Sequence, residues 1–158
     1  MGVAGAGKTV VGSLLASGLA VPFLEGDDLH PPANVRKMAQ GIPLTDDDRR
    51  PWLATIAARI AEAKRSDTGL VVACSALKRA YRDMLRGADA DLRFVHLTGD
   101  RALLARRLAH RAGHFMPLSL LDSQLATLEI PSPDEHAWTC DVAETPQSIV
   151  ARIVARLG

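Results

Sequence analysis

Residues 2–9 read Gly2-Val3-Ala4-Gly5-Ala6-Gly7-Lys8-Thr9 and fit the pattern G-x-x-x-x-G-K-[S/T] without a mismatch. In this pattern, glycines let backbone N–H groups curl around a phosphate, and the helix that follows adds the positive end of its dipole. The Lys8 amine can reach the β- and γ-phosphates of a nucleotide, and the Thr9 hydroxyl can ligate Mg²⁺. We therefore predict a site for ATP and Mg²⁺ formed by Gly2, Val3, Ala4, Gly5, Ala6, Gly7, Lys8, Thr9 and Val10.

Short apolar runs alternate with helical patterns along the rest of the chain. Strands are expected at residues 21–24, 70–74, 92–97 and 137–142, and helices at 8–18, 33–40, 51–65, 77–86, 100–111, 117–128 and 146–157. The run at 70–74 is continuously apolar, which is typical of a strand buried on both faces. Such an alternation predicts an α/β fold with a parallel sheet between helical layers. Ligands of these sheets lie beyond the carboxyl ends of the strands.

The size and charge of the chain exclude several classes of protein. A length of 158 residues suits a single domain, and a net charge of +1 provides no general attraction for nucleic acid or for an anionic membrane. No apolar stretch is long enough to span a bilayer, and no secretory signal is visible. Two cysteines are too few for a disulfide scaffold, so we expect buried, reduced thiols and a cytoplasmic protein.

The strand that normally precedes a phosphate loop is missing or truncated, because only Met1 stands before Gly2. That strand lies in the middle of such a sheet, and its loss costs on the order of several kcal/mol. We therefore expect the reading frame to begin upstream, with Met1 as an internal methionine at the end of the first strand.

Carboxylates follow the strand expected at 21–24, in the sequence Glu25-Gly26-Asp27-Asp28. The chain has neither an Asn-Lys-x-Asp motif nor an Asp-x-x-Gly switch, so a GTPase is not expected. Glu25 and Asp27 are two residues apart and point to the same side of an extended chain. We expect Glu25 to support Mg²⁺ through water and Asp27 to act as the catalytic base for a substrate hydroxyl. A solvated acidic turn is the alternative.

Several blocks together resemble the short, P-loop gluconate kinases of the thermoresistant type. The matching blocks are 26–35 (GDDLHPPANV), 37–38 (KM), 41–49 (GIPLTDDDR), 51–53 (PWL), 74–79 (CSALKR), 81–83 (YRD), 113–117 (GHFMP), 121–124 (LDSQ) and 127–129 (TLE). The resemblance implies a three-layer P-loop NTPase fold of the nucleoside and shikimate kinase type, with a parallel five-stranded sheet, a movable lid and a tendency to form homodimers. It also implies ATP-dependent phosphorylation of the 6-hydroxyl of D-gluconate. The family usually has Asp where this chain has Glu25.

Gluconate is a small anion with many hydroxyls, so its site needs a cation and several hydrogen-bonding groups. The expected substrate-binding set is Asp27, His30, Arg36, Arg49, Lys78, Arg82 and His114. For the basic residues of this set, the alternative is that they lie on a solvated face and do not bind the substrate.

An arginine-rich segment resembles the lid of these kinases, which we place around residues 106–118 of a single domain covering 1–158. Arg107 and Arg111 share a helix face and, with Lys8, are expected to stabilise charge on the transferring phosphoryl group. His110 and His114 lack a third ligand nearby, so we do not expect a metal there. Two other functions stay open: a kinase for another small hydroxylated acid, and a nucleotide-binding protein without catalysis.

Overall fold

The computed structural model describes residues 1–110 and 118–158, and within them it forms an α/β fold. The α-helices are α1 (Lys8–Leu19), α2 (Pro32–Ala39), α3 (Asp46–Ser66), α4 (Arg79–Arg86), α5 (Arg101–Ala109), α6 (Leu118–Thr127) and α7 (Pro146–Leu157). The strands are β1 (Phe23–Glu25), β2 (Val71–Ala73), β3 (Val95–Thr98) and β4 (Trp138–Asp141). Two short 3-10 helices, η1 (Gly26–Leu29) and η2 (Pro133–Glu135), follow β1 and precede β4.

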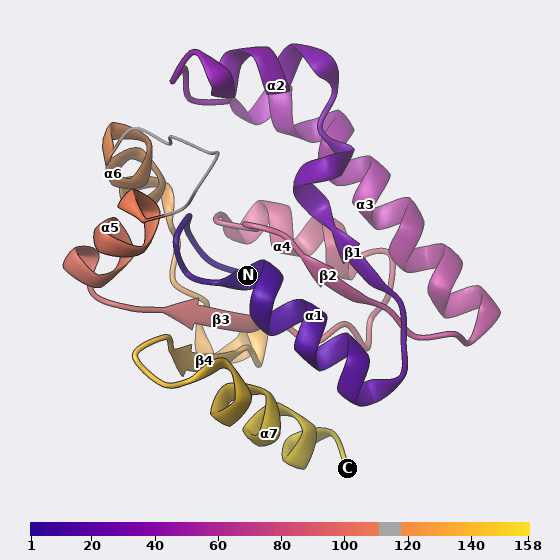
Figure 1. Cartoon of the computed structure of the whole chain (residues 1–158). Coiled ribbons are helices and arrows are strands. Elements are labelled where there is room, and N and C mark those ends of the chain that lie inside the picture. The colour runs from indigo at the N-terminus through magenta and orange to yellow at the C-terminus, as the bar shows by residue number, and fades with distance from the viewer. Residues whose placement is uncertain (111–117) are drawn as a thin grey trace.

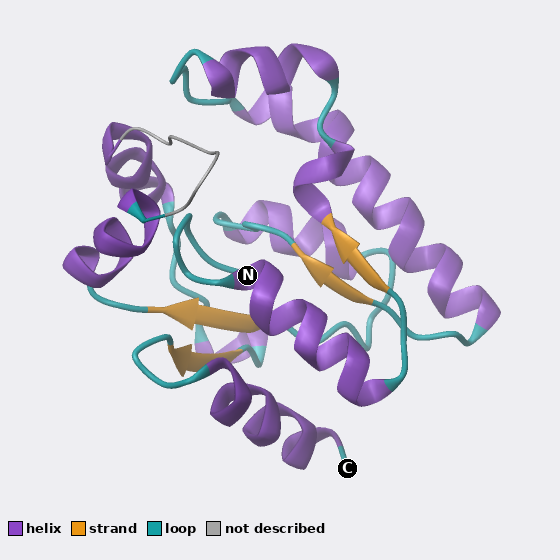
Figure 2. Ribbon diagram, in the orientation of Figure 1, coloured by secondary structure: helices purple, strands orange, loops and turns teal. Residues whose placement is uncertain are grey.

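Helices cover both faces of the strands, which gives three layers (Figure 2). On one side α1 packs against α7, and Val11, Leu15, Ile149 and Ile153 share a core with Leu97 of β3. On the other side α3 packs against α4, and their buried side chains meet Phe94 beside β3. The predicted order of helices and strands is therefore confirmed.

The strands of the described residues form two parallel pairs, and this differs from the expected continuous five-stranded sheet. β1 pairs with β2, with Phe23 opposite Val71, and β3 pairs with β4, with Val95 opposite Trp138. The N-terminus lies between the two pairs (Figure 1). Met1 bonds to β3 through its nitrogen to Val95 O at 2.5 Å and through its oxygen to Leu97 N at 2.9 Å, while Gly2 N donates to Ser75 O at 3.1 Å. Met1 and Gly2 are too short a segment to count as a strand. They connect the two strand pairs by hydrogen bonds, but the pairs do not form one continuous sheet.

Two expectations about individual elements were wrong. Helix α3 begins at Asp46 rather than at Pro51, because Thr45 and Asp48 form a capping box upstream of the proline. The segment around β2 is not buried on both faces, since Leu70, Val71 and Val72 are only half-buried. These three residues line a groove of about 390 Å³ between the strand pairs, which explains their exposure.

No helix among residues 1–110 and 118–158 is long and apolar enough to cross a membrane.

Candidate active site

The glycine-rich loop before α1 has the geometry of an anion-binding site. Gly5 and Gly7 adopt φ values of +78° and +81°, which residues other than glycine rarely adopt. A Cβ on Gly5 would lie 2.8 Å from Leu104 O, so α5 also requires a glycine there. Helix α1 begins at Lys8, directly after the loop, and the Lys8 amine donates to Val3 O at 3.1 Å. The loop therefore presents backbone N–H groups, a cation and a helix N-terminus in one place.

Oxygen ligands for a divalent cation lie at the start of α1. The Thr9 hydroxyl donates to Glu25 Oε2 at 2.6 Å, which joins the loop to the end of β1. Hydroxyl and carboxylate oxygens are the protein ligands that Mg²⁺ prefers. The two residues that were expected near Mg²⁺ are thus side by side, and their chemistry fits the ion.

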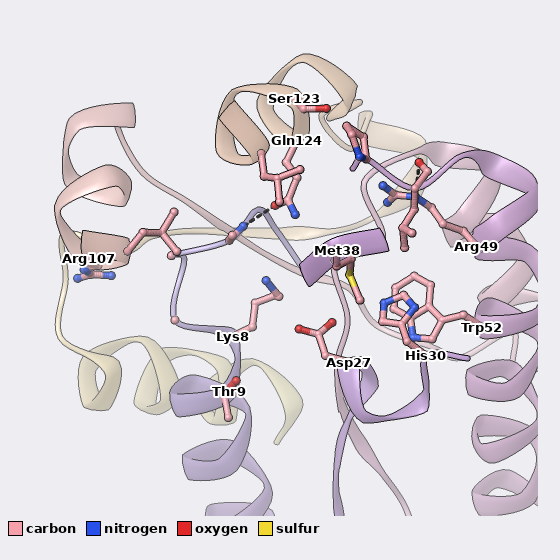
Figure 3. Close-up of a pocket in the computed structure, with 18 of the residues that line it drawn as sticks. Lys8, Thr9, Asp27, His30, Met38, Arg49, Trp52, Arg107, Ser123 and Gln124 are labelled. Atoms are coloured by element: carbon pink, nitrogen blue, oxygen red, sulfur yellow. Dashed lines mark hydrogen bonds between the residues drawn. The ribbon is translucent and has the colours of Figure 1, made fainter. Parts of the chain in front are cut away.

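A cavity of about 560 Å³ extends from this loop toward η1 and α3 (Figure 3). Its lining residues are Ala4, Gly5, Gly7, Lys8, Thr9, Val10, Asp27, His30, Met38, Ile42, Pro43, Leu44, Arg49, Trp52, Ser75, Arg107, Leu108, Leu120, Ser123, Gln124 and Pro146. In Figure 3 the Asp27 carboxylate and the Lys8 amine both project into the same part of the cavity. A proton acceptor therefore faces the phosphate-binding loop.

Trp52 and His30 form one wall of the cavity. Their rings are stacked with centroids 4.2 Å apart, and Trp52 Nε1 donates to the Gly26 carbonyl at 2.7 Å. Trp52 is buried on α3, so it fixes both the start of η1 and the ring of His30. Burial lowers the pKa of His30 and so favours the neutral imidazole; the Asp27 charge opposes this shift and the Arg49 charge adds to it. A neutral imidazole can both donate and accept a hydrogen bond.

Arg49 supplies a cation on the same side of the cavity. Its guanidinium lies 5.8 Å from the centre of the Tyr81 ring, and its Nε donates to Leu44 O at 3.4 Å. Tyr81 itself donates its hydroxyl to Asp46, and Lys78 donates to Asp46 at 2.8 Å. Lys78 is therefore engaged with Asp46 and does not line the cavity.

Arg82 is not brought to the cavity, and its expected role in substrate binding is corrected. Its side chain is 0% exposed and pairs with Glu135 at 2.5 Å, while Glu135 is 1% exposed. The same guanidinium donates to the carbonyls of Ala76 and Leu77, both at 3.1 Å. All these contacts are internal, so Arg82 is a structural residue. Arg36 lies on α2 and is exposed outside the cavity lining.

The structure describes only part of the arginine-rich segment that we place around residues 106–118. Arg107 lines the cavity near Gly7, and its Nη2 donates to Val142 O at 2.6 Å. Arg111 and His114 lie outside the described residues. Among residues 1–110 and 118–158, no cluster of three or more His, Cys, Asp or Glu side chains could bind a metal.

Four polar or aromatic lining residues received no role from the sequence: Trp52, Ser75, Ser123 and Gln124. All four belong to blocks that carry the family resemblance, which was the available signal. Their positions in the chain do not reveal that α3 and α6 face the same cavity.

Comparisons of the sequence and of the structure with known proteins agree with one another. A sequence model of the shikimate kinase family matches residues 4–157. The chain is 50% identical over 154 residues to a gluconokinase of Gluconobacter oxydans, covering 98% of this chain and 86% of that protein. It is 41% identical over 155 residues to the thermoresistant gluconokinase of Escherichia coli, covering 98% and 89%. A crystal structure of a gluconokinase from Sinorhizobium meliloti superposes with a TM-score of 0.87 at 50% identity, covering 99% of this chain and 92% of that chain.

Proposed function

The chain belongs to the shikimate kinase family, and within it to the gluconokinases, and from this premise we propose that it transfers the γ-phosphoryl group of ATP to the 6-hydroxyl of D-gluconate. The products are 6-phospho-D-gluconate and ADP. The observation that carries the proposal is the cavity that joins the phosphate loop to a wall with the carboxylate of Asp27, the imidazole of His30 and the guanidinium of Arg49.

Asp27 accepts the proton of the attacking hydroxyl in this proposal. It lines the cavity opposite Lys8, so a hydroxyl beside its carboxylate would face the phosphate loop. A positioned carboxylate that accepts a substrate proton is the usual base in phosphoryl transfer to a hydroxyl. Lys8 and Arg107 contribute positive charge near the transferring group, and Arg111 keeps this role as a prediction.

Thr9 would ligate Mg²⁺ directly, and Glu25 would assist through water. The hydroxyl-to-carboxylate contact of 2.6 Å supports this pairing. When bound, Mg²⁺ neutralises charge on the β- and γ-phosphates.

Arg49 and His30 are the side chains we propose for recognition of gluconate. The Arg49 guanidinium suits a carboxylate because it offers several N–H donors in one plane. The neutral His30 suits hydroxyl groups, since it can donate to one and accept from another. Arg36 and Lys78 stay secondary predictions because neither lines the cavity, and His114 lies outside the described residues.

The sheet, by our proposal, reaches five parallel strands when a strand occupies the groove between β2 and β3. Met1 already bonds to Val95 and Leu97 as a strand neighbour of β3 does, which supports this architecture. A single kinase domain over 1–158 and a cytoplasmic location stay predictions from the sequence, and a lid around 106–118 and a homodimer stay predictions from the family resemblance.

A coupled assay of ADP release tests the function, with MgATP and D-gluconate and with a panel of other sugar acids and shikimate. We expect turnover that requires gluconate, and a 6-phosphorylated product by NMR. Turnover with another acid but not with gluconate would assign a related kinase. ATP binding without transfer to any acid would assign a non-catalytic nucleotide-binding protein.

A further inference from the structure

Gln124 on α6 contacts the phosphate loop directly. Its side-chain oxygen Oε1 accepts the backbone N–H of Ala4 at 2.7 Å, across 120 residues of sequence. Both residues line the same cavity as Gly5 and Lys8. A hydrogen bond from a backbone donor must end on the amide oxygen rather than on its nitrogen. The contact therefore fixes which way the amide of Gln124 is turned.

The other end of this amide is directed into the cavity. With Oε1 on Ala4, the Nε2 group of Gln124 points into the space in front of Lys8 (Figure 3). An amide nitrogen carries two N–H donors and has no charge. It therefore offers donors on the side where the Lys8 amine reaches the terminal phosphates of a nucleotide.

Packing of α6 fixes the position of Gln124. Leu121 is 0% exposed on the neighbouring turn, and Asp122 forms a two-bond ion pair with Arg101 of α5 at 2.6 and 2.9 Å. Just beyond the helix, the Glu129 N–H donates to Leu77 O at 2.9 Å. An amide on a helix anchored in this way is oriented before the ligand arrives, which is the condition for strong stabilisation of developing charge.

We propose that Gln124 is a catalytic residue that donates from Nε2 to a γ-phosphoryl oxygen of ATP while its Oε1 orients the loop at Ala4. This role rests on the proposed function, since it assumes a nucleoside triphosphate at the phosphate loop. Gln124 then distinguishes ATP from ADP, because only ATP has the phosphoryl group that its nitrogen contacts.

Replacement of Gln124 by Glu tests the two proposed roles of the amide separately. In Gln124→Glu one oxygen still accepts from Ala4, whereas the donor that faces the phosphate becomes a carboxylate oxygen. We expect kcat with MgATP to fall ~100-fold, as for removal of one oriented donor in other enzymes. The affinity for a non-hydrolysable ATP analogue should fall at least ~10-fold more than the affinity for ADP, because only ATP brings a γ-phosphoryl group next to the new carboxylate. Calorimetric titration of both nucleotides measures this difference.

The exposed Gln40 at the end of α2 gives a matched control, since Gln40→Glu adds the same charge outside the cavity lining. Gln124→Met removes both ends of the amide and serves if Gln124→Glu does not fold. For Gln124→Met we again expect a larger loss for the ATP analogue than for ADP. Equal losses for the two nucleotides, or none, would overturn the proposal and leave Gln124 as a loop support. Because the titrations need no gluconate, they decide this point even if the wild-type protein phosphorylates another acid.

Discussion

Asp27 and Asp28 are adjacent, but only Asp27 lines the cavity that contains Lys8. If Asp27 accepts the hydroxyl proton, Asp27→Asn should lower kcat by about 10²–10⁴-fold, because the amide cannot take up a proton. The affinity for ATP should stay near the wild-type value, since the phosphate loop is unchanged. Steady-state kinetics and nucleotide titration measure the two effects. Asp28→Asn is the matched control, and equal activity of the two variants would remove Asp27 from the mechanism.

The buried pair of Arg82 and Glu135 links stability to pH. Hydrogen bonds from Arg82 lower the pKa of Glu135 from 4.5 to about 2. Between these values the unfolded chain binds a proton that the folded chain does not, so stability falls as the pH decreases from about 4.5 toward about 2. The contribution present above pH 4.5 is roughly 3 kcal/mol.

Glu135→Gln should remove this acid-dependent part of the unfolding free energy. It should also cost about 3–5 kcal/mol at neutral pH, because the Arg82 charge stays buried without its partner. Urea unfolding at pH 7 and pH 3 measures both effects. The double variant Arg82→Met with Glu135→Leu removes both charges and should be less destabilised than Glu135→Gln. An unchanged pH dependence in Glu135→Gln would show that this pair is not the acid-sensitive group.

At the scale of elements, α3 orients η1 through one buried hydrogen bond. Trp52→Phe keeps an aromatic ring against His30 but leaves the Gly26 carbonyl without the indole donor. We expect a loss of about 1–3 kcal/mol in unfolding free energy. We also expect a lower kcat, because η1 carries Asp27. Trp138→Phe on β4, outside this cavity, is the control and should leave kcat near the wild-type value. If both variants keep full turnover, α3 does not position η1 for catalysis.

Local patterns predicted the elements better than the contacts between them. The phosphate loop and the alternation of strands and helices follow from short stretches, so their order was confirmed. The start of α3 was missed because Pro51 suits a first helical turn, whereas the capping box of Thr45 and Asp48 begins the helix earlier. Arg82 was misassigned because its partner Glu135 is 53 residues away, and no local pattern announces a buried ion pair.

At the scale of the whole molecule, the groove between β2 and β3 has the properties of a strand site. Its volume of about 390 Å³ exceeds what close-packed interiors leave open, and apolar side chains such as Val11, Leu15 and Val72 line it. In the β1–β2 pair, Val71 N bonds to Pro22 O, so the backbone groups of Val71 face β1. Successive residues of a strand direct their backbone groups to opposite sides, so the N–H and C=O of Val72 face the groove. On the opposite side, Val95 and Leu97 present the groups that bond to Met1. Both sides of the groove therefore offer backbone partners to a parallel strand.

An apolar extension attached at the Met1 nitrogen tests this architecture. Five residues match a typical strand, and a Val- and Ile-rich extension of about that length should raise the midpoint of thermal unfolding by roughly 5 °C or more. The reason is that the extension would bury apolar surface and pair backbone groups on both sides of the groove. A Gly/Ser extension of equal length is the matched control, because it offers the same backbone with little apolar surface. Amide hydrogen exchange should slow at Val72 and Val95 only with the apolar extension. If the two extensions change stability and exchange equally, the groove does not accept a strand, and the sheet functions as two bridged pairs.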